Sequence, residues 1–217
     1  MKNVIIFFII ILFFSCKKGT NNSISAKERN NQAKILNTED SLRSIYMSGK
    51  NIFSGDSILA IKNYFDHLTE NKGYLILKKQ NESYQKHYAN FINIDTPQSH
   101  STQLNFKFEK QFLSNEKKYR IVLYTLIDNK KKDSIEFYRN VNDLKYEPSN
   151  YTCLSYLDFK NKKIWQIKYF SSPINKSVGY ILYEKNKVMA NGKIEKDSLY
   201  YLDESLDVEM EKNNLYY

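Results

Sequence analysis

The spacing of apolar residues changes at Gly73. Before this glycine, apolar side chains recur every three to four residues, which is the period of a helix with one buried face. After it they alternate with polar residues, which is the period of a strand. We therefore expect helices over about 26–72 and an antiparallel sheet over about 74–211, together forming a single domain over 26–217.

Three helices are predicted before Gly73. One covers 26–36 and a second covers 39–47. The third runs from 57 to 72, with Asp56 as its N-cap and Gly73 just past its end. Its apolar stripe, which must pack on another layer, consists of Ile58, Ile61, Tyr64, Phe65 and Leu68.

The strands predicted after Gly73 are separated by short polar turns, with no crossover helices between them. They cover 74–79, 84–94, 103–112, 119–127, 134–141, 151–159, 164–170, 178–184, 187–190, 193–195, 199–202 and 205–211. Asn191-Gly192 is the strongest hairpin signal among the turns. Short turns without crossovers indicate an antiparallel meander. The predicted class is α+β, with amino-terminal helices packed on a large curved antiparallel β-meander or incomplete barrel.

The amino terminus has the pattern of an export signal. Lys2 precedes an unbroken run of 11 apolar residues over 4–14. A helix needs about 20 apolar residues to cross a bilayer, so this run is too short for a lasting membrane span. Residues 1–15 therefore form a predicted signal peptide. Residues 16–25, from Cys16 onward, form a polar tether.

Ser15-Cys16 at the end of this run resembles the lipobox of bacterial lipoproteins, in the looser form typical of Bacteroidota-like envelopes. Phe13 and Phe14 depart from the Leu and small residue that usually precede the cut. The resemblance implies cleavage before Cys16 and attachment of lipid to its thiol. By the sorting rules of such proteins, Lys17 in place of Asp favours the outer membrane. The absence of a following acidic cluster favours its periplasmic face. An ordinary secretory peptide or an uncleaved anchor is the alternative.

The composition and net charge of the chain limit the kinds of partner that we expect. The 217 residues include 33 Lys and Arg against 24 Asp and Glu, a net charge of +9, and are 41% hydrophobic. That apolar content excludes a wholly disordered chain. An exported, lipid-tethered protein does not meet nucleic acid, so we expect no nucleic-acid partner despite the basic charge. The expected partners are the membrane, through lipid on Cys16, and an envelope protein, lipid or glycan.

Lysines gather in three of the predicted turns. An uninterrupted up-and-down meander would bring these three turns to the same end of the sheet. The lysines are Lys130, Lys131, Lys132, Lys160, Lys162, Lys163, Lys185 and Lys187. We hypothesise that this end contacts an anionic surface of envelope lipid or glycan. Lysines that only keep the turns soluble are the alternative.

No catalytic, metal or cofactor site is predicted. Cys153 has the setting of a buried strand thiol, without the exposed, basic surroundings of a nucleophile. The three histidines share no metal-ligand spacing: His67, His87 and His100. Two Ser-x-x-Lys patterns, over 83–86 and 114–117, lack the accompanying Lys-Thr-Gly of penicillin-binding enzymes. The acidic residues over 203–211 are interpreted as the solvated face of a strand.

Three functions remain open. The first is a non-catalytic binding or scaffolding module. The second is a carrier of an apolar ligand, in a pocket lined by Phe106, Phe108, Trp165 and Tyr169, although these side chains also suit an ordinary core. The third is a hydrolase whose residues come together only in the fold. A filled core favours the first, a large apolar cavity the second, and a polar cleft with converging His, Ser or carboxylates the third.

Overall fold

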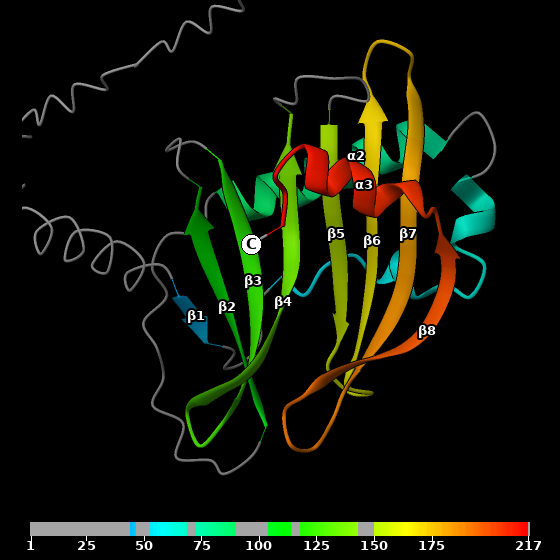
Figure 1. Cartoon of the computed structure of the whole chain (residues 1–217). Helices are drawn as coiled ribbons and strands as arrows, with labels where there is room; N and C mark the ends of the chain where they lie inside the picture. The colour runs from blue at the N-terminus through cyan, green and yellow to red at the C-terminus, as the bar shows by residue number, and fades with distance from the viewer. Residues whose placement is uncertain are drawn as a thin grey trace, which may run out of the picture. The chain divides into compact units, whose positions relative to one another are not determined.

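An antiparallel sheet of eight strands is the framework of the computed structural model (Figure 1). The structure describes residues 44–46, 53–68, 73–89, 104–113, 118–142 and 150–216. The signal peptide, Cys16, the tether, the predicted helix over 26–36 and His100 lie outside the described residues.

The strands follow one another in the sheet in chain order. They are β1 (Ser44–Tyr46), β2 (Asn105–Phe112), β3 (Tyr119–Ile127), β4 (Lys130–Val141), β5 (Asn150–Asp158), β6 (Lys163–Ser172), β7 (Ser177–Val188) and β8 (Ile194–Leu202). Each neighbouring pair is antiparallel, and β1 and β8 are the two edges of an open sheet. The predicted α+β class and the meander are therefore confirmed. β7 and β8 each join two strands that the sequence predicted separately.

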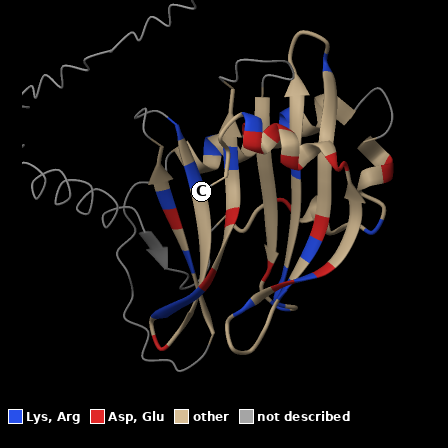
Figure 2. Cartoon of the chain, viewed as in Figure 1, with Lys and Arg blue, Asp and Glu red and all other residues tan. Residues whose placement is uncertain are grey.

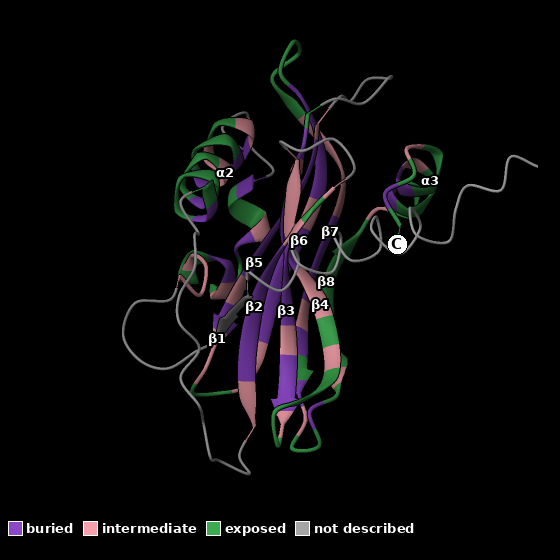
Figure 3. Ribbon diagram, turned by 90° about the vertical axis from the view of Figure 1, so that its left-hand side faces the viewer, coloured by how far each residue is buried: buried purple, intermediate pink, exposed green. Residues whose placement is uncertain are grey.

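One helix lies on each face of this sheet (Figure 3). α2 (Gly73–Ala89) covers the face that carries the larger core, where Leu77 and Tyr84 are fully buried. α3 (Ser205–Lys212) covers part of the opposite face, where Leu206 and Met210 belong to a smaller core with Phe170. The helical layer predicted on one face is thus supplemented by a helix on the other.

The predicted helix over 57–72 is wrong. Its described residues, 57–68, form two short 3-10 turns, η1 (Ser57–Ala60) and η2 (Phe65–Leu68). Asp56 does cap the first turn, because its side chain accepts a hydrogen bond from the Ile58 amide at 3.1 Å. The carbonyl group of Leu59, which a continuing helix would use, instead accepts a hydrogen bond from the Tyr183 hydroxyl. The hydrogen bond from Tyr183 of the sheet thus takes the place of a hydrogen bond within a helix.

The predicted strands over 74–79 and 84–94 are also wrong, because residues 73–89 form α2. The buried positions Leu77, Tyr84 and Tyr88 follow helical spacing. Gly73, predicted as the end of a helix, is the first residue of this one. A Cβ atom at Gly73 would lie 2.1 Å from the Leu68 carbonyl oxygen, so this close approach requires glycine.

Two further segments differ from their predictions. Residues 205–211 form most of α3 and not a strand: Leu206 and Met210, four residues apart, are buried, whereas Val208 between them is 63% exposed. Within the predicted helix over 39–47, the described residues 44–46 form β1, which pairs with β2.

Buried tyrosines fasten α2 and the segment before it to the sheet. They are Tyr64, Tyr84, Tyr88, Tyr138, Tyr169 and Tyr183. A buried phenol needs a hydrogen-bond partner for its hydroxyl group, and here carbonyl groups often supply it. Tyr88 donates to the Phe53 carbonyl at 3.1 Å, and Tyr183 donates to that of Leu59. Burial raises the pKa of every one of these hydroxyl groups, which keeps them protonated donors.

Tyr84 holds three parts of the chain together. Its hydroxyl oxygen accepts a hydrogen bond from the Asp56 amide at 2.8 Å and donates one to the Ser155 carbonyl at 2.7 Å. The helix α2, the segment over 53–56 and strand β5 therefore share one buried hydroxyl group.

The segment over 53–56 occupies the place where β4 would otherwise pair with β5. Its Ser54 carbonyl accepts a hydrogen bond from the Leu157 amide of β5 at 2.7 Å. Gly55 has φ of +94°, and a Cβ atom there would lie 2.0 Å from the Ser155 carbonyl oxygen. β4 consequently pairs with β5 only over 138–141. The rest of β4 leaves β5 and approaches β8, where Asp133 accepts a hydrogen bond from the Ile194 amide at 2.8 Å.

We predict that Tyr84→Phe lowers the free energy of unfolding by about 1–3 kcal/mol, because the buried Ser155 carbonyl loses its donor. Urea denaturation of the variant and of wild type measures the difference. Tyr156→Phe is the matched control, because Tyr156 is the half-exposed residue next to Ser155 on β5. Its expected effect is within about 0.5 kcal/mol. Equal losses in the two variants would contradict the role given to the Tyr84 hydroxyl.

Candidate functional site

Three hairpin turns that contain lysines or have them close by in the adjoining strands lie at one end of the sheet. The β3–β4 turn is at 128–129, the β5–β6 turn at 159–162 and the β7–β8 turn at 189–193. The strand registers put all three turns at the same end, which is the lower end in Figure 2. The prediction that the first two turns lie at the same end is therefore correct, whereas the third turn lies at 189–193 and not at Lys185 and Lys187, which belong to β7. Lys130, Lys131 and Lys132 were also predicted in a turn, but they form the start of β4, and Lys163 is the first residue of β6.

Four of the eight predicted lysines are engaged or partly buried. Lys131 forms an ion pair with Glu109 at 3.1 Å, and Lys185 forms one with Asp197 at 2.6 Å. Lys162 lies over the ring of Phe106, and Lys163 is half-buried. Partial burial alone would raise the pKa of the Glu109 carboxyl, but hydrogen bonds from Lys107 and Lys131 outweigh it and lower the pKa. The charge of Lys131 is thus already paired with Glu109 of the same domain.

The other four lysines are exposed, and a fifth joins them from the β7–β8 turn. We call these five residues the lysine rim: Lys130, Lys132, Lys160, Lys187 and Lys193. None has a carboxylate within ion-pair distance among the described residues. Two exposed carboxylates, Asp128 and Glu195, share this end of the sheet. Lys193 was missed by the sequence analysis, although the Asn191-Gly192 turn signal already placed it beside a turn.

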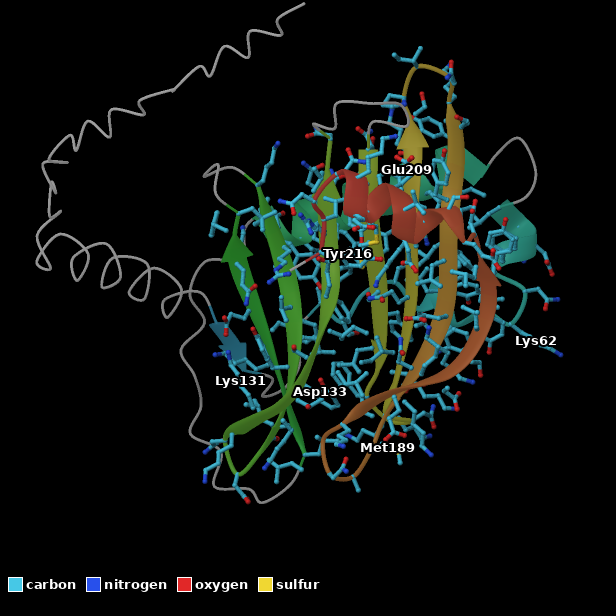
Figure 4. All side chains as sticks on the ribbon, in the orientation of Figure 1. Lys62, Lys131, Asp133, Met189, Glu209 and Tyr216 are labelled. Carbon is cyan, nitrogen blue, oxygen red and sulfur yellow. The ribbon has the colours of Figure 1, made fainter. Side chains whose placement is uncertain are left out.

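Two of the hairpins touch each other at this end (Figure 4). The Thr125 hydroxyl donates a hydrogen bond to the Gly192 carbonyl, and a Cβ atom at Gly192 would lie 2.8 Å from the Lys132 Cβ atom. This contact, together with that between Asp133 and Ile194, fixes the β3–β4 turn against the β7–β8 turn. Lysines from both hairpins therefore belong to one surface.

The four residues predicted to line an apolar pocket all belong to the larger core. Phe106 packs edge-on against Phe159, and Phe108 packs edge-on against Phe137. Trp165 stacks on Tyr183, 6.0 Å between ring centroids. Phe106, Phe108 and Trp165 thus belong to the packed core. Tyr169 also belongs to it, and one side of Tyr169 lines a polar cavity.

This polar cavity, of about 270 Å³, lies between α2 and the end of the sheet opposite the lysine rim. From α2 it is lined by Tyr74, Leu77, Lys78, Asn81, Glu82 and Gln85. From β4, β5, β6 and the chain next to them it is lined by Asn140, Asn142, Asn150, Tyr169, Ser171 and Pro173. The sequence analysis missed it, because it had assigned part of α2 to strands.

The structure places three of the residues considered above for catalysis or metal binding. Cys153 is fully buried, and burial raises the pKa of its thiol well above the ordinary value, which opposes a nucleophilic role. His67 and His87 are exposed, and His87 stacks on Phe53. No group of three or more metal-ligating side chains occurs within the described ranges. Residues 83–86 lie on α2, and residues 114–117 lie outside the described chain.

Comparisons with models of protein families, with curated proteins and with solved structures found no match to this chain. Among the helices that the structure describes, none combines the length and apolarity of a membrane span.

We predict that Cys153 reacts with a thiol reagent such as DTNB only when the protein is unfolded, because its thiol is buried and stays protonated. The reaction is followed in a Cys16→Ser background, so that Cys153 is the single thiol. Negligible reaction in buffer and one thiol released in urea are expected. Fast reaction of the native protein would show an accessible, activated thiol and would contradict this account.

Proposed function

We propose that this protein is a lipid-anchored component of a bacterial cell envelope, and that its domain is a non-catalytic binding or scaffolding module. The lysine rim would contact an anionic envelope surface, made of lipid headgroups or charged glycan. The membrane would be the outer one, with the domain on its periplasmic face. The observation that carries the proposal is the collection of five exposed lysines from separate hairpins at one end of the sheet.

Simple electrostatics supports a surface contact of this kind. Each basic residue close to an anionic membrane contributes about 1 kcal/mol, and these contributions add along the surface. They extend over a Debye length of about 8 Å at physiological salt, so flat contact by several turns is more effective than contact by one. A lipid on Cys16 would keep the domain near the membrane and so raise the effective concentration of the surface around it.

The two alternative functions have less support. A carrier of apolar ligands needs an apolar cavity, whereas Phe106, Phe108 and Trp165 pack in the core. A hydrolase needs a nucleophile beside a base, whereas the Cys153 thiol is buried and His67 and His87 are exposed on the surface.

We predict that the protein incorporates radiolabelled palmitate in its native host and that Cys16→Ala abolishes the label, because the Cys16 thiol is the proposed attachment point. Cys153→Ala is the matched control and should keep the label. The Cys16→Ala protein should also leave the membrane fraction on washing at high salt. Palmitate on the Cys16→Ala protein, or its retention by membranes after the wash, would contradict the lipid anchor.

We further predict that the rim lies against anionic headgroups. The lipidated protein is reconstituted in vesicles with spin-labelled headgroups and carries a fluorophore at Ala190→Cys, in the β7–β8 turn. Quenching should be strong with anionic lipid, weaken with added salt and weaken in a variant with Lys130, Lys132, Lys160 and Lys193 changed to Gln.

Two controls accompany this experiment. A fluorophore at Ile174→Cys, in the turn at the opposite end, should remain unquenched. Four exposed lysines away from the rim serve as the matched charge control when changed to Gln: Lys62, Lys79, Lys86 and Lys176. If the two sets of lysine changes reduced quenching equally, net charge and not the rim would account for the contact.

A further inference from the structure

We propose that the cavity between α2 and the sheet binds a neutral carbohydrate, through amide groups on both of its walls. This second site lies at the end of the domain opposite the lysine rim, and it does not depend on the function proposed above. It rests on a polar wall of the sheet, a polar stripe on α2 and the hydrogen bonds of the amides themselves.

The wall of the sheet is polar where a core would be apolar. On the face that α2 covers, Asn140 of β4 pairs with Thr152 of β5, and Thr152 pairs with Tyr169 of β6. In the next row toward the end of the sheet, Asn150 pairs with Ser171. Further from this end, the same face carries apolar core residues such as Leu154. This face of the sheet therefore changes from apolar core to polar surface toward the end that the cavity occupies.

The wall formed by α2 is polar in the same place. Lys78, Asn81 and Gln85 are spaced three and four residues apart, so they form one stripe along the helix. A polar stripe normally faces open water. Lys78 and Gln85 are exposed and Asn81 is half-buried, and all three line a hollow whose other wall is also polar. Two polar walls facing each other across a hollow are the arrangement of a site for a polar ligand.

The hydrogen bonds orient two of the amides. The Oδ1 atom of Asn81 accepts from the Tyr138 hydroxyl at 3.1 Å, and that of Asn140 accepts from the Thr152 hydroxyl at 3.3 Å. Their Nδ2 groups make no hydrogen bond within the described part of the chain, and so remain as donors. The side-chain amides of Gln85, Asn142 and Asn150 likewise have no partner among the described residues. The cavity thus offers several donors and acceptors at once.

The charges and the apolar contacts narrow the ligand class. Lys78 and Glu82 are the two charged lining residues and have opposite signs, whereas recognition of a phosphate or carboxylate favours several cations or a bidentate Arg. Tyr74, Leu77 and Tyr169 add aromatic and apolar surface. A neutral sugar matches this combination, because its hydroxyl groups suit amides and its C–H faces suit aromatic rings. The volume of about 270 Å³ is just below the range of about 300–1,000 Å³ for ligand sites, which suits a ligand as small as a sugar.

Saturation-transfer NMR on the protein purified from its host, in a detergent without a sugar headgroup, tests this proposal whether or not the protein carries lipid. The probes are glucose, galactose, mannose, N-acetylglucosamine and their disaccharides at millimolar concentration, with inorganic phosphate as the anionic probe. We expect saturable binding of at least one neutral sugar. Asn150→Leu and Gln85→Leu, which remove no hydrogen bond within the described chain, should each weaken binding about tenfold.

Asn63→Leu is the matched control, because Asn63 is exposed and lies outside the cavity. It should leave sugar binding unchanged, as should the Gln substitutions in the lysine rim. Circular dichroism establishes that each variant is folded. The proposal is overturned if none of the sugars binds, if phosphate binds in preference to them, or if Asn63→Leu weakens binding as much as Asn150→Leu does.

Discussion

The hydrogen bonds of the Tyr84 hydroxyl are the contact on which the arrangement of this domain depends. One buried oxygen accepts from Asp56 and donates to Ser155, so α2, the segment over 53–56 and β5 keep fixed relative positions. The segment then takes the edge of β5 that β4 would otherwise pair with. β4 is left to reach toward β8, and the β3–β4 and β7–β8 hairpins meet. This series of contacts therefore determines how the hairpins are arranged at the end of the sheet that carries the lysine rim.

The two ends of the sheet differ in chemistry for a structural reason. At one end the β3–β4 and β7–β8 hairpins touch each other, and exposed lysines of both hairpins lie near this contact. At the other end α2 spans polar rows of β4, β5 and β6, and amide groups line the space between them. In the view of Figure 1 these are the lower and upper ends of the same sheet. A surface contact and a ligand site could therefore operate together, because neither uses the residues of the other.

The sequence predicted the sheet well and the helices poorly. From Gln103 to Leu202 each strand alternates or is apolar on both faces, and its polar turns are short, so the register of the meander follows from local pattern. The stretch over 57–89 has apolar runs whose period is ambiguous, and tyrosine hydroxyl groups bonded to distant carbonyls decided its structure. In α3, the apolar residues Leu206, Val208 and Met210 alternate with polar ones, which is the pattern of a strand. Only Leu206 and Met210 are buried, and their spacing of four residues is that of a helix. Ion pairs such as that of Lys131 with Glu109 join different strands. They could not be predicted without knowing the register of the strands.

Hydrogen–deuterium exchange of the protein on vesicles tests the proposed orientation of the domain most directly. Exchange on anionic vesicles is compared with exchange on zwitterionic vesicles, peptide by peptide. The account predicts that anionic lipid slows exchange over 128–132, 159–163 and 187–193, which include the three turns and the strand ends beside them, and leaves the turn over 173–176 unchanged. Equal exchange on the two kinds of vesicle, or protection of 173–176 in place of the three lysine-bearing turns, would contradict it.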